Sequence, residues 1–331
     1  MGGGRQMYIP RDVGGRRTDG VNLIDWATEE GYTYAADKSD FDEALEEGLL
    51  PMPFLGLFTS SHMAYELDRN PENEPSLLEM TETAIKTLVD ATEDSEKGYF
   101  IMIEASRIDH AGHANDAAGH VHDTLMFNEV MAYLKEHVSE HPDTQLLSAA
   151  DHECGGLTLN DGWDPTVVAK AQNTAEFLSS KFNSEVGDDV AAYLRDTLLP
   201  LAGVTWASDE DIAHFVEVYE ADGTSAMGLA ILNVFAEEAG VNWSTGGHTA
   251  ADIQLHGYVA DRHAYEYMKH EIGSNRPNTE LAKYVEKVLG LSLSNVTESL
   301  RADGVDWVQK RDQLDAIKRE ARSAKLHHNH S

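Results

Sequence analysis

Short apolar runs alternate with longer amphipathic stretches through the first 150 residues of the chain. The runs predict four strands, at residues 32–35, 55–58, 99–103 and 146–150. Helical spacing of apolar residues predicts helices between them, at residues 21–30, 40–46, 77–89 and 117–137. The run at 99–103 follows a glycine and carries no charge, which is typical of a strand buried on both faces. This order predicts an α/β fold with a mostly parallel central sheet and helices on both faces.

The pattern becomes helical after Gly156. Four helical segments are predicted with little strand signal between them, near residues 166–183, 188–200, 208–220 and 225–239. The most apolar stretch, at 226–235, is too short to cross a membrane and is predicted to be buried helix. A further strand is predicted within 252–259, and a further helix from Asn278 to near Gly290.

Charged side chains and histidines follow two of the predicted strands. Glu104, Asp109 and His113 come after the strand at 99–103, and Asp151 and His152 come after the strand at 146–150. Ligands of open α/β sheets bind beyond the carboxyl ends of the strands. We therefore expect these five side chains to converge at one edge of the sheet.

A divalent cation is the natural partner of such a cluster, because an unpaired buried carboxylate costs several kcal/mol. Asp109 and His113 are four residues apart, on one side of a helical turn, and mixed oxygen and nitrogen donors suit zinc. Glu104 adds a hard oxygen donor that could serve magnesium. The alternative is that an acidic, histidine-rich chain produces these clusters in solvated loops.

The composition narrows the classes of partner. The 331 residues include 58 acidic and 25 basic side chains, for a formal net charge of −33. This balance argues against nucleic acid or an anionic membrane as a partner, because no basic stripe can neutralise phosphates. No apolar stretch reaches the ~18–20 residues of a membrane helix, and no secretory signal is visible in residues 1–20. The single cysteine, Cys154, excludes an intramolecular disulfide and is interpreted as a buried structural thiol.

Three motifs carry a family resemblance. They are Ile-Glu-Ala-Ser-Arg-Ile-Asp-His-Ala-Gly-His at 103–113, Ala-Asp-His-Glu at 150–153 and Gly-Gly-His-Thr-Ala at 246–250. In this order they resemble the three metal-binding motifs of alkaline phosphatases, with the eukaryotic and fungal type most similar. The resemblance extends along most of the chain.

The resemblance implies a zinc-dependent phosphomonoesterase that binds two zinc ions and one magnesium ion. The metal ligands it implies are Asp109, His113 and His248 at the first zinc, Asp151 and His152 at the second zinc, and Glu104 at the magnesium. His110 matches a position near the phosphate, whereas Arg107 matches no assigned role. The family reaction proceeds through a phosphoserine on the enzyme.

One departure from the family pattern concerns the nucleophile. No Asp-Ser-Ala motif of the kind that carries the family's serine occurs in the chain, so no catalytic nucleophile is assigned. Residues 1–10 resemble an interior loop of the family, and we expect the N-terminal part of the fold to be missing. Two hypotheses follow, a truncated alkaline phosphatase and a catalytically weak zinc-binding relative. A phosphodiesterase or a sulfatase of the same superfamily is a less favoured third.

The resemblance also bears on domains and partners. Residues 157–244 are interpreted as a helical insertion into a core formed by residues 1–156 and 245–331, with the alternative that they complete the core. Phosphate monoesters are the implied substrates and a homodimer is the implied assembly. A secreted, cell-surface or vacuolar location is implied, whereas the sequence itself leaves the compartment open.

Overall fold

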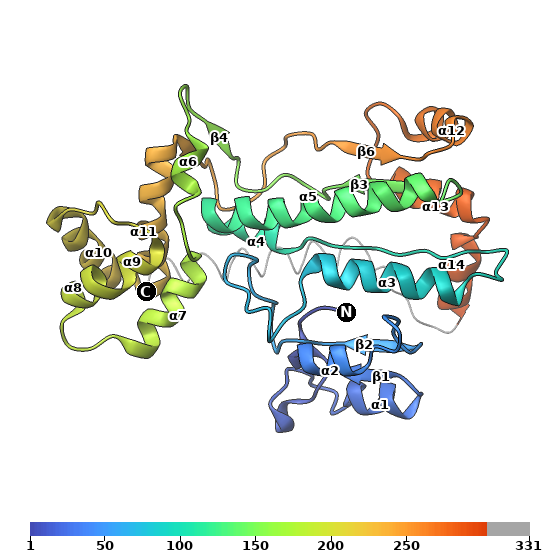
Figure 1. The fold of residues 1–331 in the computed structure, drawn as a ribbon, viewed down its shortest axis with the longest axis horizontal. Helices are drawn as coiled ribbons and strands as arrows, with labels where there is room; N and C mark the ends of the chain where they lie inside the picture. The colour runs from blue at the N-terminus through green and yellow to red at the C-terminus, as the bar shows by residue number, and fades with distance from the viewer. Residues whose placement is uncertain (303–331) are drawn as a thin grey trace. The chain divides into compact units, whose positions relative to one another are not determined.

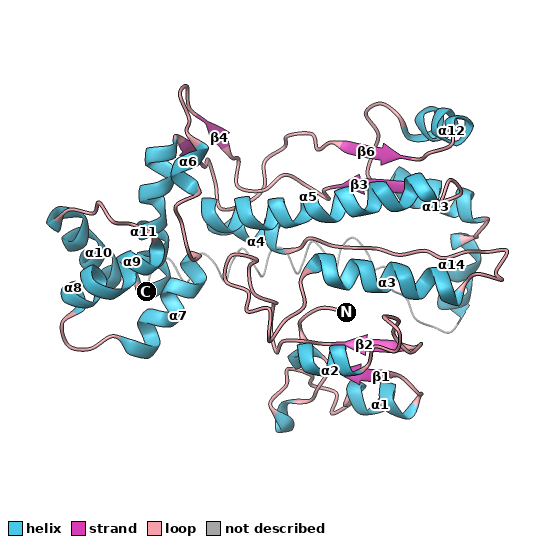
Figure 2. Cartoon of the chain, in the orientation of Figure 1, coloured by secondary structure: helices cyan, strands magenta, loops and turns pink. Residues whose placement is uncertain are grey.

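The structure is a computed structural model that describes residues 1–302 (Figure 1). Residues 1–265 form one compact unit, and a second unit begins at Glu266. Helices predominate over strands in the described residues (Figure 2). Residues 303–331, predicted from the sequence to be part of the core, lie outside the described residues.

The N-terminal segment contains a small parallel sheet. The strands β1 (Thr33–Ala35) and β2 (Phe54–Gly56) pair in parallel, and the helices α1 (Leu23–Glu29) and α2 (Lys38–Glu43) each lie next to β1 in the chain. Phe41 of α2 is buried, and its ring meets the edges of Phe54 and Phe58 at centroid distances of 6.3 and 5.7 Å. The strands predicted at 32–35 and 55–58 are therefore confirmed.

Two long helices, α3 (Leu77–Ala91) and α5 (Ala117–Glu140), run side by side and share an apolar cluster around Ile85, Val130 and Leu134 (Figure 1). A capping box begins α3. Ser76 Oγ accepts the backbone N–H of Glu79 at 3.0 Å, and Glu79 Oε2 accepts that of Ser76 at 2.8 Å. The sequence predicted both helices from their apolar spacing.

The predicted strand at 99–103 is wrong. The segment is extended, yet it pairs with no strand within residues 1–302. Tyr99, Ile101 and Ile103 pack against the cluster between α3 and α5, whereas Phe100 and Met102 are 62% and 81% exposed. The run is therefore buried on one side only, and a strand of a parallel sheet needs backbone partners that the described residues do not supply here.

The remaining strands are antiparallel. β3 (Leu146–Ala149) pairs with β6 (Leu255–Tyr258), and β4 (Thr158–Leu159) pairs with β5 (Val241–Asn242). In place of the predicted mostly parallel central sheet, the described residues form three two-stranded sheets, of which one is parallel. The difference arises because β3 and β4 each pair with a segment that follows the helical region, and those segments return in the opposite direction.

The region between β4 and β5 is helical, as predicted. Its elements are α6 (Pro165–Val168), α7 (Ala175–Glu185), α8 (Val190–Tyr193), a π-helical turn (Leu194–Leu198), α9 (Leu199–Ala202), α10 (Asp209–Asp222) and α11 (Thr224–Ala239). Met227, Ile231 and Phe235 of α11 are buried in the largest apolar cluster. Gly228 allows α11 to approach α7, because a Cβ there would lie 2.8 Å from the carbonyl oxygen of Ala175. That this region is an insertion stays a prediction.

A buried carboxylate, Asp116, and a half-buried one, Asp68, join α7 to the rest of the first unit. Asp116 accepts the N–H of Ala175, the first residue of α7, at 2.8 Å and the N–H of Gly119 at 2.9 Å. Asp68 accepts the N–H of Thr174 at 3.0 Å. Negative charge at a helix N-terminus is favourable, but burial raises the pKa of both Asp68 and Asp116.

The C-terminal helices are α12 (Arg262–Ile272), which spans the boundary between the two units, α13 (Thr279–Leu289) and α14 (Leu293–Ala302). Within the second unit, Lys287 of α13 forms an ion pair with Glu271 of α12 at 2.8 Å. The helix predicted from Asn278 to near Gly290 is confirmed as α13. Among residues 1–302, no helix combines the length and the apolar character needed to cross a bilayer.

Replacing Phe182 by alanine should reduce the free energy of unfolding by about 3–5 kcal/mol, because the side chain is fully buried between Tyr193 and Tyr219. Phe100→Ala is the matched control, since its ring is exposed, and it should change the free energy by less than about 0.5 kcal/mol. Urea unfolding followed by circular dichroism would measure both. Equal losses for the two variants would contradict the position of the core.

Candidate metal centre

The helix α4 (Arg107–Ala114) carries two candidate ligands one turn apart. Asp109 Oδ2 lies 3.6 Å from His113 Nε2. The helix ends at Ala114, and the C-cap residue Asn115 adopts a left-handed conformation with φ of 58°. Asn115 Nδ2 donates to the carbonyl oxygens of Gly112 and Thr245, both at 2.9 Å. The end of α4 is thereby tied to the loop that contains His248.

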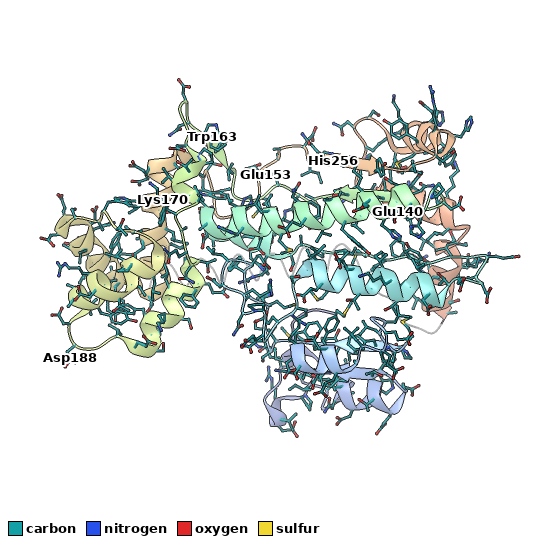
Figure 3. The ribbon with its side chains drawn as sticks, in the orientation of Figure 1. Glu140, Glu153, Trp163, Lys170, Asp188 and His256 are labelled. Carbon is teal, nitrogen blue, oxygen red and sulfur yellow. The ribbon has the colours of Figure 1, made fainter. Side chains whose placement is uncertain are left out.

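Glu153, which Figure 3 labels, lies on the loop after β3 and accepts hydrogen bonds from Thr249 on the loop after β5. Its Oε2 accepts the hydroxyl of Thr249 and, at 3.0 Å, the N–H of Thr249. Its Oε1 accepts the N–H of Gly156 at 2.7 Å. The hydrogen bond from the Thr249 hydroxyl is the main cause that lowers the pKa of Glu153. The sequence did not predict this role, because only the position of Thr249 in space identifies it.

Gly155 allows the same two loops to meet. Its N–H donates to the carbonyl of Gly247 at 2.8 Å, and its φ of +84° is one that side-chain-bearing residues rarely adopt. A Cβ at this position would lie 2.5 Å from the Trp243 ring and 2.7 Å from the carbonyl oxygen of Gly112. The close approach of α4 and Trp243 to residue 155 therefore requires glycine at that position.

Four side chains meet where these elements converge. Asp109, His113, Cys154 and His248 each offer one donor atom within 4.8 Å of those of the other three. The Nε2 atoms of His113 and His248 are 3.2 Å apart, although the residues are separated by 135 positions in the chain. The three residues that the resemblance assigned to the first zinc are thus brought together. We call this set, with Cys154, the four-residue group.

The backbone orients His113. Its Nδ1 lies 2.8 Å from the carbonyl oxygen of Gly246. Because a carbonyl oxygen only accepts, Nδ1 carries the hydrogen, and in the neutral ring the lone pair of Nε2 faces the four-residue group. Metal-binding histidines commonly use their second nitrogen in this way.

His152 lies beside the four-residue group. Its ring stacks on His248 with centroids 3.5 Å apart, and its Nδ1 lies 3.9 Å from Asp109 Oδ1. Its Nε2 is 3.2 Å from Asp151 Oδ2, and the Asp151 side chain is 79% exposed. Among the described residues, neither Asp109 Oδ1 nor His152 Nδ1 has a hydrogen-bond partner, although both atoms are buried.

Buried polar atoms without partners are costly. Cations bound beside Asp109 and His152 would offset this cost, and the oxygen, nitrogen and sulfur donors of the four-residue group suit zinc. The residues present therefore fit a bound metal. Without a cation, burial and then the hydrogen bond to and charge of Asp109 raise the pKa of Cys154 to about 11. The thiol is then protonated at neutral pH.

Glu104 and His110 line a cavity of about 790 Å³ in the first unit. Glu104 is not a member of the four-residue group. Arg107 lines the same cavity, and its Nη1 lies 3.2 Å from His110 Nδ1. Because a guanidinium only donates, His110 Nδ1 accepts and the neutral ring carries its hydrogen on Nε2. Burial, followed by the charge of Arg107, lowers the pKa of His110 and favours this neutral form.

Arg107, to which the sequence assigned no role, is 7% exposed. Its guanidinium lies 3.5 Å from the centroid of the Tyr65 ring, and its Nη2 pairs with Glu176 of α7 at 2.8 Å. Cation–π and ion-pair contacts together hold the guanidinium in place. Arg107 therefore connects α7 to His110.

A family profile described as alkaline phosphatase matches residues 1–291. The repressible alkaline phosphatase of Saccharomyces cerevisiae is 32% identical over 330 residues, covering 91% of this chain and 58% of that protein. The alkaline phosphatase of Schizosaccharomyces pombe is 33% identical over 327 residues, covering 95% and 59%. The chain thus spans less than two thirds of the length of these relatives.

Solved structures show a similar fold. The cold-active alkaline phosphatase of Shewanella sp. superposes with a TM-score of 0.67 at 21% identity, covering 87% of this chain and 64% of that one. The alkaline phosphatase of Thermus thermophilus superposes with a TM-score of 0.64 at 22% identity, covering 83% and 62%. The described elements therefore follow the alkaline phosphatase fold, with smaller and more fragmented sheets than the sequence predicted.

We expect the wild-type chain to lose stability as the pH rises from about 4 to about 7, and we expect Asp123→Asn to remove this loss. Burial raises the pKa of Asp123 to about 7, so the folded chain retains a proton that the unfolded chain releases, and folding weakens as the pH rises through this range. Relative to wild type, the variant should gain on the order of 1 kcal/mol between pH 4.5 and pH 7.5. Urea unfolding at both pH values measures the difference.

The exposed Asp143→Asn serves as the control for removing one negative charge. The amide oxygen introduced by Asp123→Asn can still accept the N–H of Glu66, which the carboxylate of Asp123 accepts at 3.2 Å. A pH dependence identical in wild type and Asp123→Asn would contradict the raised pKa.

Proposed function

The chain belongs to the alkaline phosphatase family, and on this premise we propose that it binds zinc and acts in the hydrolysis of phosphate monoesters. The observation that carries the proposal is the convergence of Asp109, His113 and His248 from distant parts of the sequence. Because the chain spans 58–59% of its two fungal relatives, the activity and substrates of the whole protein are part of the proposal.

The proposed metal ligands follow the three family motifs. They are Asp109, His113 and His248 for one zinc, Asp151 and His152 for a second zinc, and Glu104 for magnesium. The first set is supported by its geometry, and the second by the position of His152 beside Asp109. Glu104 is supported by the family pattern and by its place in the cavity that His110 also lines.

Zinc bound there would act as a Lewis acid on the phosphoryl oxygens and on the leaving oxygen. The residues of the chain would supply orientation. Gly246 holds His113 in the tautomer that presents Nε2, and Arg107 holds His110 in the tautomer that presents an Nε2–H donor. His110 would donate that hydrogen bond to a phosphate oxygen in the cavity.

A catalytically weak zinc-binding relative is the second candidate. Its basis is that no Asp-Ser-Ala motif occurs in the 331 residues, so no serine among them is assigned as the nucleophile. An enzyme whose nucleophile acts as a unit with its neighbours loses several powers of ten in rate when the nucleophile is removed. The homodimer implied by the resemblance stays a prediction.

Loss of a residue that hydrogen-bonds to a metal ligand typically weakens metal binding roughly 10- to 100-fold. His248→Ala removes a proposed ligand itself, so it should weaken zinc binding by more than this. Competition with a chromophoric chelator measures the affinity, and elemental analysis measures the zinc content. The exposed His256→Ala, on β6, is the matched control and should bind zinc as wild type does. Equal affinities in the two variants would contradict the assigned ligand set.

Turnover of p-nitrophenyl phosphate at alkaline pH separates the two candidate functions. We expect a phosphatase to lose activity with a chelator, regain it with zinc, and lose at least about 100-fold in His248→Ala. Zinc binding without turnover would instead support the catalytically weak relative. A wild-type chain that binds no zinc would contradict both.

A further inference from the structure

We propose that Cys154 is a fourth protein ligand of the metal at Asp109, His113 and His248. The metal would then be held by one oxygen, two nitrogens and one sulfur. The inference rests on the metal binding proposed above and adds a thiolate to it, a donor that the sequence motifs did not assign.

The position of Cys154 supports this assignment. Its Sγ is among the four donor atoms that lie within 4.8 Å of one another. It also lies 3.6 Å from the carbonyl oxygen of Asp109, so the thiol is next to the backbone of a candidate ligand. Cys154 is half-buried and is not a member of the apolar clusters around Phe182, Phe41 and Ile85, unlike the buried structural thiol that the sequence predicted.

Its surroundings limit where the sulfur can move. Gly112 of α4 packs against it, and a Cβ at Gly112 would lie 3.1 Å from Cys154 Cβ and 3.2 Å from Sγ. On either side in the sequence, Glu153 bonds to Thr249 and Gly155 bonds to Gly247. The backbone around Cys154 is therefore held on both sides, and the sulfur faces the candidate ligands.

The chemistry of the set matches zinc. Thiolate, imidazole and carboxylate are its usual protein ligands, at about 2.3, 2.0–2.1 and 2.0–2.2 Å. On binding, the S–H bond breaks and its proton passes to solvent while the metal–sulfur bond forms, so the site gains two positive charges from the metal and one negative charge from the thiolate. Sulfur also favours zinc over magnesium.

A fourth protein ligand has a consequence for catalysis. Zinc sites with four protein ligands are closed and usually structural, whereas catalytic sites keep one position for water or substrate. With Cys154 bound, the position that a phosphate oxygen would need is occupied by sulfur. Only chains in which Cys154 is not bound to the metal at Asp109, His113 and His248 would have a position free for substrate, so Cys154 would set their fraction.

Cobalt spectroscopy tests the assignment independently of activity. Thiolate ligands give Co²⁺ an intense near-ultraviolet charge-transfer absorption that oxygen and nitrogen ligands do not give. Because Cys154 is the only cysteine in the chain, the absorption has a single source. We expect it in the wild-type protein and in His256→Ala, and we expect Cys154→Ser to lose it while still binding cobalt.

The outcomes separate this inference from the proposed function. Suppose that the wild type binds cobalt without this absorption and that His248→Ala weakens the binding. This result would overturn the role of Cys154 and leave the metal centre in place. A wild type that binds no cobalt and no zinc would overturn both proposals. Far-ultraviolet circular dichroism verifies that each variant is folded.

Zinc affinity provides a second measurement. Cys154→Ser should bind zinc at least about 10-fold more weakly than wild type, since even outer partners of a metal site contribute that much. Alkylation by iodoacetamide, measured at one alkaline pH where part of the thiol is ionised, should be slower with zinc bound than in the metal-free wild type. Unchanged zinc affinity together with unprotected alkylation would overturn the proposal.

Discussion

The carboxylate of Glu153 holds together the two loops on which the candidate metal centre depends. His152 precedes it in the sequence, and His248 precedes its partner Thr249. Together with the hydrogen bond from Gly155 to Gly247, this side chain holds the loops in which the two imidazoles stack at a centroid distance of 3.5 Å. Charge-assisted hydrogen bonds of this kind are stronger than neutral ones, which suits a contact that holds two loops together.

The helical region between β4 and β5 is connected to the candidate site through α4. Arg107 begins this helix and pairs with Glu176 of α7, while Asp109 and His113 lie further along it. Asp116 follows the helix and accepts the N–H of Ala175. One short helix thus carries the candidate ligands and also anchors the N-terminus of α7.

The extended segment at 99–103 connects the apolar packing to the chemistry of the cavity. Its inward side chains pack on α3 and α5, while Phe100 and Met102 remain exposed. Glu104 follows directly and lines the cavity together with His110. None of the four-residue group lines this cavity, although His110 directly follows Asp109 on α4.

The sequence determined the features that depend on local spacing or on ordered motifs. Local spacing predicted the capping box at Ser76 and the helices before and after it in the chain. The ordered motifs predicted that His113 and His248 meet. The tertiary structure alone decided how the strands pair and which other residues join the site. An apolar run such as 99–103 does not reveal whether one face or both faces are covered, because its partners are non-local. Cys154 and Glu153 likewise acquire their roles from groups 45 and 96 positions away in the chain, which folding places within contact distance.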